Sequence, residues 1–195
     1  MPIELGTKGQ PGFDDPIGLM MDCHRRIERF LSVLEHIADR FAGGGLSGEA
    51  VAAMRVALRY FRESAPHHTA DEEASLFPRL REVNESAGGL DCLLLEAERL
   101  ELQHRRAEAL HASVDRLCTR WLTLGLLDGD EIAALEHDLR ELRSLYAEHI
   151  AFEDETLFPS AARMLGREAL DRIGREMAER RGHEDGPAPG KERGA

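Results

Sequence analysis

The chain has 195 residues, which is enough for one domain with a full hydrophobic core and too few for two domains of ordinary size. Its 37 acidic residues outnumber 25 basic ones, giving a formal net charge of -12, and the basic residues are scattered along the chain. This balance argues against a surface that follows nucleic-acid phosphates and against binding to anionic membranes.

Targeting signals and cysteine usage both favour a cytoplasmic protein. No apolar run approaches the roughly 20 residues that span a bilayer, and residues 1–15 lack the charged-then-apolar layout of a signal peptide. The three cysteines, Cys23, Cys92 and Cys118, are widely spaced and form no C-x-x-C pair. They predict reduced, packed thiols in place of disulfides or a zinc knuckle, although Cys23 beside His24 could line a site.

Hydrophobic periodicity predicts an all-α protein, because no segment alternates as an exposed strand does. Residues 14–181 are expected to form one domain, an up-down-up-down four-helix bundle with a short C-terminal fifth helix. The five predicted helices cover residues 14–42, starting at an Asp cap and a Pro, 51–78, kinked at Pro66, 90–124, 130–158 and 167–181. A Gly-rich turn at 43–48, a linker at 84–89 and a turn at 125–129 separate the first four. An N-terminal arm at 1–13 and a disordered tail at 182–195 complete the chain.

Two sequence motifs occur twice. The pattern H-x-A-x-E-x-x-x-L-F-P begins at His68 and again at His149, and the pattern H-R-R-x-E begins at His24 and again at His104. Residues four apart on a helix lie one turn apart on one face, so each copy of the longer motif presents a His and a Glu together. The chain is therefore read as two similar halves, each with one lone His and one His-x-x-x-Glu.

The spacing of the four histidines predicts that they meet. The midpoint between each successive pair falls inside a predicted turn, and arms of equal length on either side of a turn end at the same height in an up-down bundle. Four imidazoles with the carboxylates of Glu72 and Glu153 would then lie in one layer of an apolar core. Imidazole with carboxylate suits iron, manganese or zinc, and two carboxylates can bridge a pair of cations.

The alternative is that these residues are solvated or incidentally buried. That alternative requires six polar side chains at one height, in duplicated spacing, with nothing to offset the desolvation of two carboxylates.

Other candidates for metal ligands are weaker. His67 points about 100° away from His68, and Glu28 and Glu108 are expected to pair with the arginines three residues before them. Glu101 belongs to an isolated Glu-x-x-His, His111 is expected to line the core, and His36, His137 and His183 have no matching partners.

Over residues 14–165 this pattern resembles the hemerythrin-like, or HHE cation-binding, family. The resemblance rests on His24, His68-x-x-x-Glu72, His104 and His149-x-x-x-Glu153, with Leu-Phe-Pro after each second motif. It implies a four-helix bundle around a non-haem di-iron centre with an oxo- or hydroxo-type bridge. By that resemblance His24 and His68 would serve one iron, His104 and His149 the other, and Glu72 and Glu153 would bridge; zinc or manganese are possible substitutes for the two iron ions.

The sequence departs from the oxygen-carrying hemerythrins at two places. Those proteins have two His four residues apart on the third helix, whereas Leu100 and Glu108 flank His104 at that spacing. They also use an Asp five residues after the last-helix His, whereas this chain has Glu153 at four. The resemblance is therefore to bacterial relatives that do not carry oxygen, and Glu108, Glu101 or solvent would have to complete the second iron.

Three functions follow from this resemblance. The first is a di-iron protein that reacts with oxygen or nitric oxide as a sensor or store, with a separate protein partner for signalling. The second is a di-iron enzyme with peroxidase-like or nitrosative, iron-centre repair activity, and the third is a metal-stabilised adaptor. Whether the protein is an enzyme is left open, and its expected partners are small molecules, with no nucleic acid and no membrane.

Overall fold

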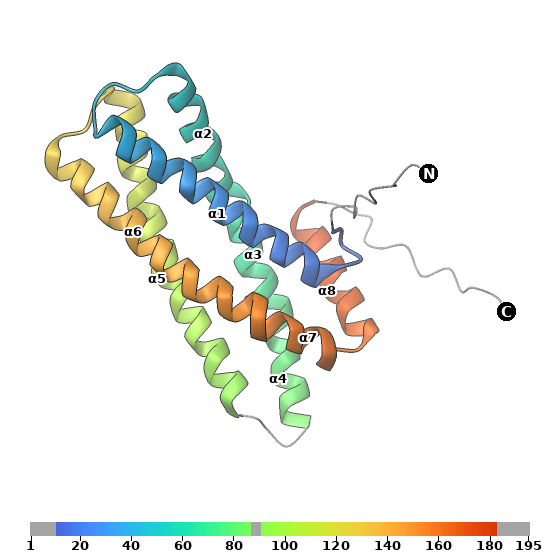
Figure 1. Cartoon of the computed structure of the whole chain (residues 1–195). Coiled ribbons are helices and arrows are strands. Elements are labelled where there is room, and N and C mark those ends of the chain that lie inside the picture. Colours follow the sequence, from blue (N-terminus) through green and yellow to red (C-terminus); the bar gives the residue numbers. More distant parts are fainter. Residues whose placement is uncertain (1–10, 87–90, 183–195) are drawn as a thin grey trace, which may run out of the picture.

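The computed structural model describes residues 11–86 and 91–182, and every regular element in those two ranges is a helix (Figure 1). Most of the predicted arm and tail, the end of the predicted linker and His183 lie outside the described residues, as does the side chain of Cys92. None of the described helices combines the length and the hydropathy needed to cross a bilayer.

The helices begin and end where the sequence supplies caps. Helix α1 (Pro16–Phe41) starts at Asp15, whose side chain accepts from the Gly18 N–H, and ends at Ala42, which has a left-handed φ of 41°. Helix α2 (Gly48–Glu63) is capped by Ser47, and α6 (Gly129–Phe152) opens with a capping box made by Asp128. Helix α5 spans Asp91–Leu124 and α8 spans Arg167–Arg180, each within one residue of its predicted limits.

The predicted ends of the second and fourth helices are wrong. We call each run of helices that follows one predicted long helix a path. The second path, which begins with α2, breaks at Ser64 and resumes as α3 (Ala65–Asp71). It then widens into the π-helical turn η1 (Glu72–Leu76) and continues as α4 (Phe77–Ser86). The fourth path likewise runs from α6 through the π-helical turn η2 (Glu153–Leu157) into α7 (Phe158–Met164). Neither path stops at its Phe-Pro, because each helix widens into a π-helical turn just before the proline, which leaves room for the proline ring beside the preceding turn.

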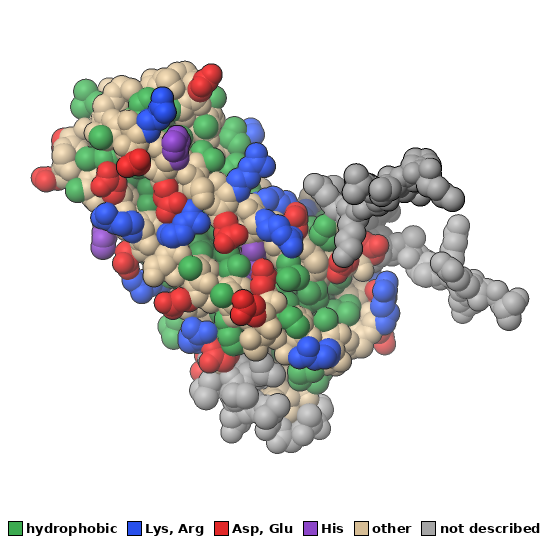
Figure 2. Space-filling view, viewed as in Figure 1, with side chains coloured by type: hydrophobic (Ala, Val, Ile, Leu, Met, Phe, Trp, Pro, Cys, Tyr) green, Lys and Arg blue, Asp and Glu red, His purple; other side chains and the backbone are tan. Residues whose placement is uncertain are grey.

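The helices pack around a common interior. Helix α1 packs against α2 and α6, and α5 packs against the same two helices. Each of these four helices therefore packs against two of the other three. Helix α8 packs against α1 and α3. Figure 1 shows it beside the beginning of α1, close to α7. On the face seen in Figure 2, acidic and basic side chains are interspersed, in keeping with the scattered charges of the sequence.

A polar layer divides the core into two apolar clusters. The first cluster holds Leu31, Leu58 and Leu145 among its buried residues, and the second holds Met20 and Leu76. Along each path the polar layer lies between members of the two clusters. The residues that form it, in chain order, are His24, His68, Glu72, His104, His149 and Glu153, all of them buried.

Helix α8 contributes to this interior through a buried ion pair. Asp71, the residue before Glu72, has no exposed surface, and its carboxylate lies 2.8 Å from Arg180 Nη1 and 2.6 Å from Arg181 Nη2. Burial of a carboxylate is costly unless cations and hydrogen bonds compensate it, and two guanidinium groups provide both. The end of α8 therefore fixes the helix that carries Glu72.

Candidate metal centre

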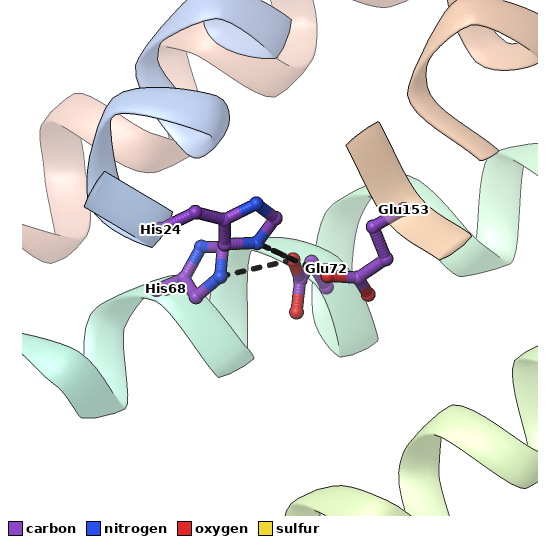
Figure 3. A group of neighbouring side chains, drawn as sticks. All are labelled: His24, His68, Glu72 and Glu153. Carbon is purple, nitrogen blue, oxygen red and sulfur yellow. Dashed lines mark ion pairs between the residues drawn. The ribbon is translucent and has the colours of Figure 1, made fainter. Parts of the chain in front are cut away.

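The structure brings all six predicted ligand side chains together. Their candidate ligand atoms form two groups, each with all atoms within 4.8 Å of one another: one holds His24 and His68, the other His104 and His149, and both include Glu72 and Glu153. Figure 3 shows the imidazoles of the first group directed at the two carboxylates. Two groups that share both carboxylates have the form of a dinuclear site, and ligation itself remains a prediction.

Each glutamate contacts imidazoles of both groups. Glu72 Oε1 lies 3.2 Å from His68 Nε2, while its Oε2 lies 3.2 Å from His104 Nε2. Glu153 Oε2 is 3.1 Å from both His24 Nε2 and His149 Nε2. Both carboxylates are thus placed between the two imidazole pairs, which is the position that a bridging ligand requires.

Three imidazoles are held from behind by residues that sequence reasoning missed. His24 Nδ1 is 2.7 Å from Asp154 Oδ1, and His104 Nδ1 is 2.8 Å from Glu73 Oε1. These bonds leave each Nε2 directed inward, as in metal sites where a carboxylate orients a histidine ligand. Asp154 directly follows Glu153 and contacts His24, which belongs to the first half of the chain. Glu73 directly follows Glu72 and contacts His104, which belongs to the second half. An acidic residue repeated after both glutamates was the available signal.

The third support is an amide. His149 Nδ1 lies 3.0 Å from Gln103 Oε1, the residue before His104. His104 Nε2 and His149 Nε2 are 3.2 Å apart, so their ligand atoms face the same point. His68 differs from the other three, because neither of its ring nitrogens has a hydrogen-bond partner within the described residues.

The buried polar atoms of the layer fit a bound cation. Both oxygens of Glu72, both oxygens of Glu153 and the Nε2 atoms of His24 and His68 are buried without a hydrogen-bond partner within the described residues. Native proteins leave few buried polar atoms unpaired, because each costs about 1–3 kcal/mol and charged atoms cost more. Lone pairs from imidazole and carboxylate that converge in this way are the donors that iron, manganese and zinc accept.

The pKa values of the buried histidines and of Glu72 also fit a site that binds a cation. Burial alone would lower the pKa of His24, but the hydrogen bond to Asp154 and the nearby carboxylate of Glu153 raise it to about 10. Burial would likewise lower the pKa of His104, but the nearby carboxylate of Glu72 and the hydrogen bond to Glu73 raise it to about 9. Burial and the charge of Glu153 raise the pKa of Glu72. The cluster therefore retains protons that a cation would displace, and metal binding should release them.

Both glutamates begin a π-helical turn. The Phe77 N–H bonds to the Glu72 carbonyl and the Phe158 N–H bonds to the Glu153 carbonyl, five residues back in each case. The wider turn relieves the clash that the following proline ring would make with the carbonyl four residues before it. The repeated Leu-Phe-Pro is thus the signal for two π-helical turns, which the sequence reading did not use.

The weaker candidates lie outside both ligand groups. Glu101 pairs with Arg81 at 2.5 Å, and Glu28 and Glu108 are exposed. The predicted ion pairs of those last two glutamates are wrong: Arg25 pairs with Asp22, and within the described residues neither Glu28 nor Glu108 lies within ion-pair distance of an arginine. Exposed pairs gain little over solvation, so long side chains do not hold them. Among the described histidines, His67 is half-buried and His36 and His137 are exposed.

The two cysteines with described side chains are free and buried, as predicted. Burial raises the pKa of Cys118 to about 12 and also raises the pKa of Cys23. A raised pKa disfavours the thiolate, which is the form on which the nucleophilic reactivity of a cysteine depends.

A cavity of about 480 Å³ adjoins the centre. The four imidazoles of His24, His68, His104 and His149 line it, whereas neither Glu72 nor Glu153 does. His111, expected at the core, also lines this cavity and lies 2.8 Å from the Tyr146 hydroxyl. The sequence reading included no such space.

Taken together, these features define an all-helical protein with a buried histidine and glutamate cluster of the kind that holds metal ions. Residues 15–161 match the Hemerythrin family, described as the Hemerythrin HHE cation binding domain, and the chain belongs to that family. An uncharacterised protein from Haemophilus influenzae is 28% identical over 158 residues, which cover 81% of this chain and 82% of that protein.

Proposed function

We propose that this protein binds two iron ions at the centre of an up-down-up-down four-helix bundle spanning residues 14–181, and that the centre reacts with oxygen or nitric oxide as a sensor or store. The observation that carries the proposal is the pair of ligand groups that share Glu72 and Glu153. Their unpaired buried atoms give a physical reason for cations to bind there. Zinc and manganese accept the same donors and are the substitutes to test.

The residues of the centre have separate tasks. His24 and His68 would hold one ion, His104 and His149 the other, and the two glutamates would offset the repulsion between the ions. Asp154, Glu73 and Gln103 keep three of the imidazoles directed inward, and the apolar clusters on either side limit water. Bound iron would supply redox chemistry and open coordination positions.

Metal analysis of protein produced in iron-replete cells, together with an absorption spectrum, tests this proposal. We expect two irons per chain in the wild type. Glu72→Ala or Glu153→Ala should lose at least one of them, because a shared carboxylate is removed. Glu28→Ala is the matched control, since Glu28 is exposed and lies outside both groups. A ratio near one in the wild type, or full occupancy in both variants, would contradict the dinuclear centre.

A second candidate is a peroxidase-like or nitrosative, iron-centre repair enzyme, which the cavity at the four imidazoles favours. Turnover separates the two candidates. Absorbance changes under oxygen or nitric oxide that reverse when the gas is removed support the sensor or store. Continued consumption of peroxide by the iron-loaded protein, at many equivalents per centre, supports the enzyme.

A further inference from the structure

The cavity is far larger than a diatomic molecule needs. A molecule of two atoms requires about the volume of one liquid water, roughly 30 Å³, whereas the cavity measures about 480 Å³. A cavity of roughly 150 Å³ is enough for benzene, and sites for small organic ligands fall at about 300–1,000 Å³. The space therefore matches an organic molecule with more than one ring.

Much of the cavity wall is apolar and aromatic, and its lining also includes charged side chains, namely Arg62, Glu73, Arg105, Glu108 and Asp115. Leu58, Phe61 and Val114 line it, and the His111 ring lies 4.4 Å from the Phe61 ring, centroid to centroid. Burial lowers the pKa of His111 to about 4, so its ring is neutral near pH 7. Its contact with the Tyr146 hydroxyl adds one fixed polar group to this wall. Apolar walls with a few placed polar groups are typical of sites for small organic ligands.

The inner end of the cavity determines the charge of the ligand. The four imidazoles line the cavity, whereas Glu72 and Glu153 do not, so a ligand in the cavity meets the imidazole side of the centre. If two divalent ions bind as proposed above, the carboxylates of Glu72 and Glu153 neutralise half of the charge at the ions themselves, and those of Asp154 and Glu73 lie one imidazole ring farther away. An oxygen that is already charged, as in an aromatic carboxylate, or that can lose its proton on binding a cation, as in a phenol, complements the positive charge at the ions.

From the size, the wall and the charge of this cavity, we propose that it binds an aromatic compound with an acidic oxygen. The ring system lies against Leu58, Phe61 and Val114, and the oxygen is directed toward the four imidazoles. The placement of the acidic oxygen rests on the proposed function, because it requires bound metal ions. The placement of the ring system does not, because the apolar wall is present without a metal.

Calorimetric titration with 2-naphthol tests the proposal, with naphthalene as the probe lacking the acidic oxygen and azide as a small anion. We expect saturable 2-naphthol binding at one site of the iron-loaded protein. Naphthalene should bind more weakly, and the difference between the two should disappear after the metal is chelated.

Two variants locate the binding site. Ala112 lines the cavity and is exposed, so Ala112→Phe should obstruct the space without overpacking the core and weaken 2-naphthol roughly tenfold or more. Ala109 is exposed on the same helix and does not line the cavity, so Ala109→Phe is the matched control and should change the affinity less than about twofold. Metal content and melting temperature, measured on both, show that each is folded and loaded.

The outcomes separate this inference from the proposed function. If azide shifts the absorbance of the iron-loaded protein and 2-naphthol does not bind, the inference is wrong and the metal centre stands. If no metal binds, and 2-naphthol and naphthalene bind equally, the metal centre and the assignment of the acidic oxygen are both overturned. Equal affinity for 2-naphthol in Ala112→Phe and in the wild type would place the ligand elsewhere and refute the inference.

Discussion

Replacing Asp154 with Asn should weaken metal binding while leaving every predicted ligand in place. The Asp154 carboxylate lies 2.7 Å from His24 Nδ1 and holds that ring with its Nε2 directed at the glutamates. Asn keeps the shape and can still accept a hydrogen bond, but it removes the negative charge that makes the imidazole a stronger donor to a cation.

The size of the effect follows from the contact. Removing a carboxylate behind a histidine ligand typically costs about 10- to 100-fold in metal affinity, which is roughly 1.4–2.7 kcal/mol. The Asp154 side chain is 29% exposed, so solvent screens part of its charge. We therefore expect a loss near the lower end, about tenfold for the ion bound by His24 and His68.

Competition with a chelator of known affinity measures the loss, ion by ion. Glu155→Gln is the matched control, because Glu155 is exposed on the same π-helical turn and the substitution removes the same charge. Its affinity should stay within about twofold of the wild type. Equal affinity in Asp154→Asn and the wild type, or an equal loss in both variants, would refute the role given to Asp154.

Three further results are expected. Chelated protein should melt roughly 5–10 °C lower than loaded protein, since a ligand at about 100 times its Kd adds about 2.7 kcal/mol, and identical melting curves would count against the metal centre. His111 has a pKa of about 4 when folded and 6.5 ordinarily, so the unfolded chain binds the extra proton and the free energy of unfolding falls as the pH drops from 6.5 toward 4, by at most roughly 3.4 kcal/mol. In urea titrations at pH 7 and 4.5, His111→Gln should lose less stability than the wild type, and equal losses would oppose this assignment. Gly174→Ala should loosen α8, because a Cβ there would lie 1.9 Å from the Phe13 carbonyl oxygen; a lower urea midpoint is expected, and an unchanged midpoint would mean that the backbone adjusts freely.

The six-residue pattern could be predicted because it depends on local periodicity and on a repeat. A His and a Glu four residues apart share a helix face wherever the helix lies, and equal arms about each turn brought the four imidazoles together without knowledge of packing angles. The limits of α5 and α8 were also close to prediction, since hydrophobic period and glycine breaks mark them.

The missed features depend on contacts across helices or on a departure from regular geometry. Asp154 and Glu73 acquire their roles only because each faces a histidine of the other half. The π-helical turns, and therefore the continuation of both paths beyond Phe77 and Phe158, come from an irregular hydrogen bond that a 3.6-residue period does not include. The cavity is a volume left between helices, which no residue pattern specifies.

The pairing of Asp71 with Arg180 and Arg181 matters for where this chain can be shortened. The family match ends at residue 161, yet both guanidinium groups that neutralise Asp71 lie beyond it, at the end of α8. A fragment trimmed to the matched region would lose both of these cations together with α8, which packs against α1, α3 and η1, so the helix that carries Asp71 would lose a neighbour as well as two ion pairs. A fragment that keeps the surroundings of Glu72 as they stand in the structure therefore extends to Arg181, about twenty residues past the limit that family membership marks.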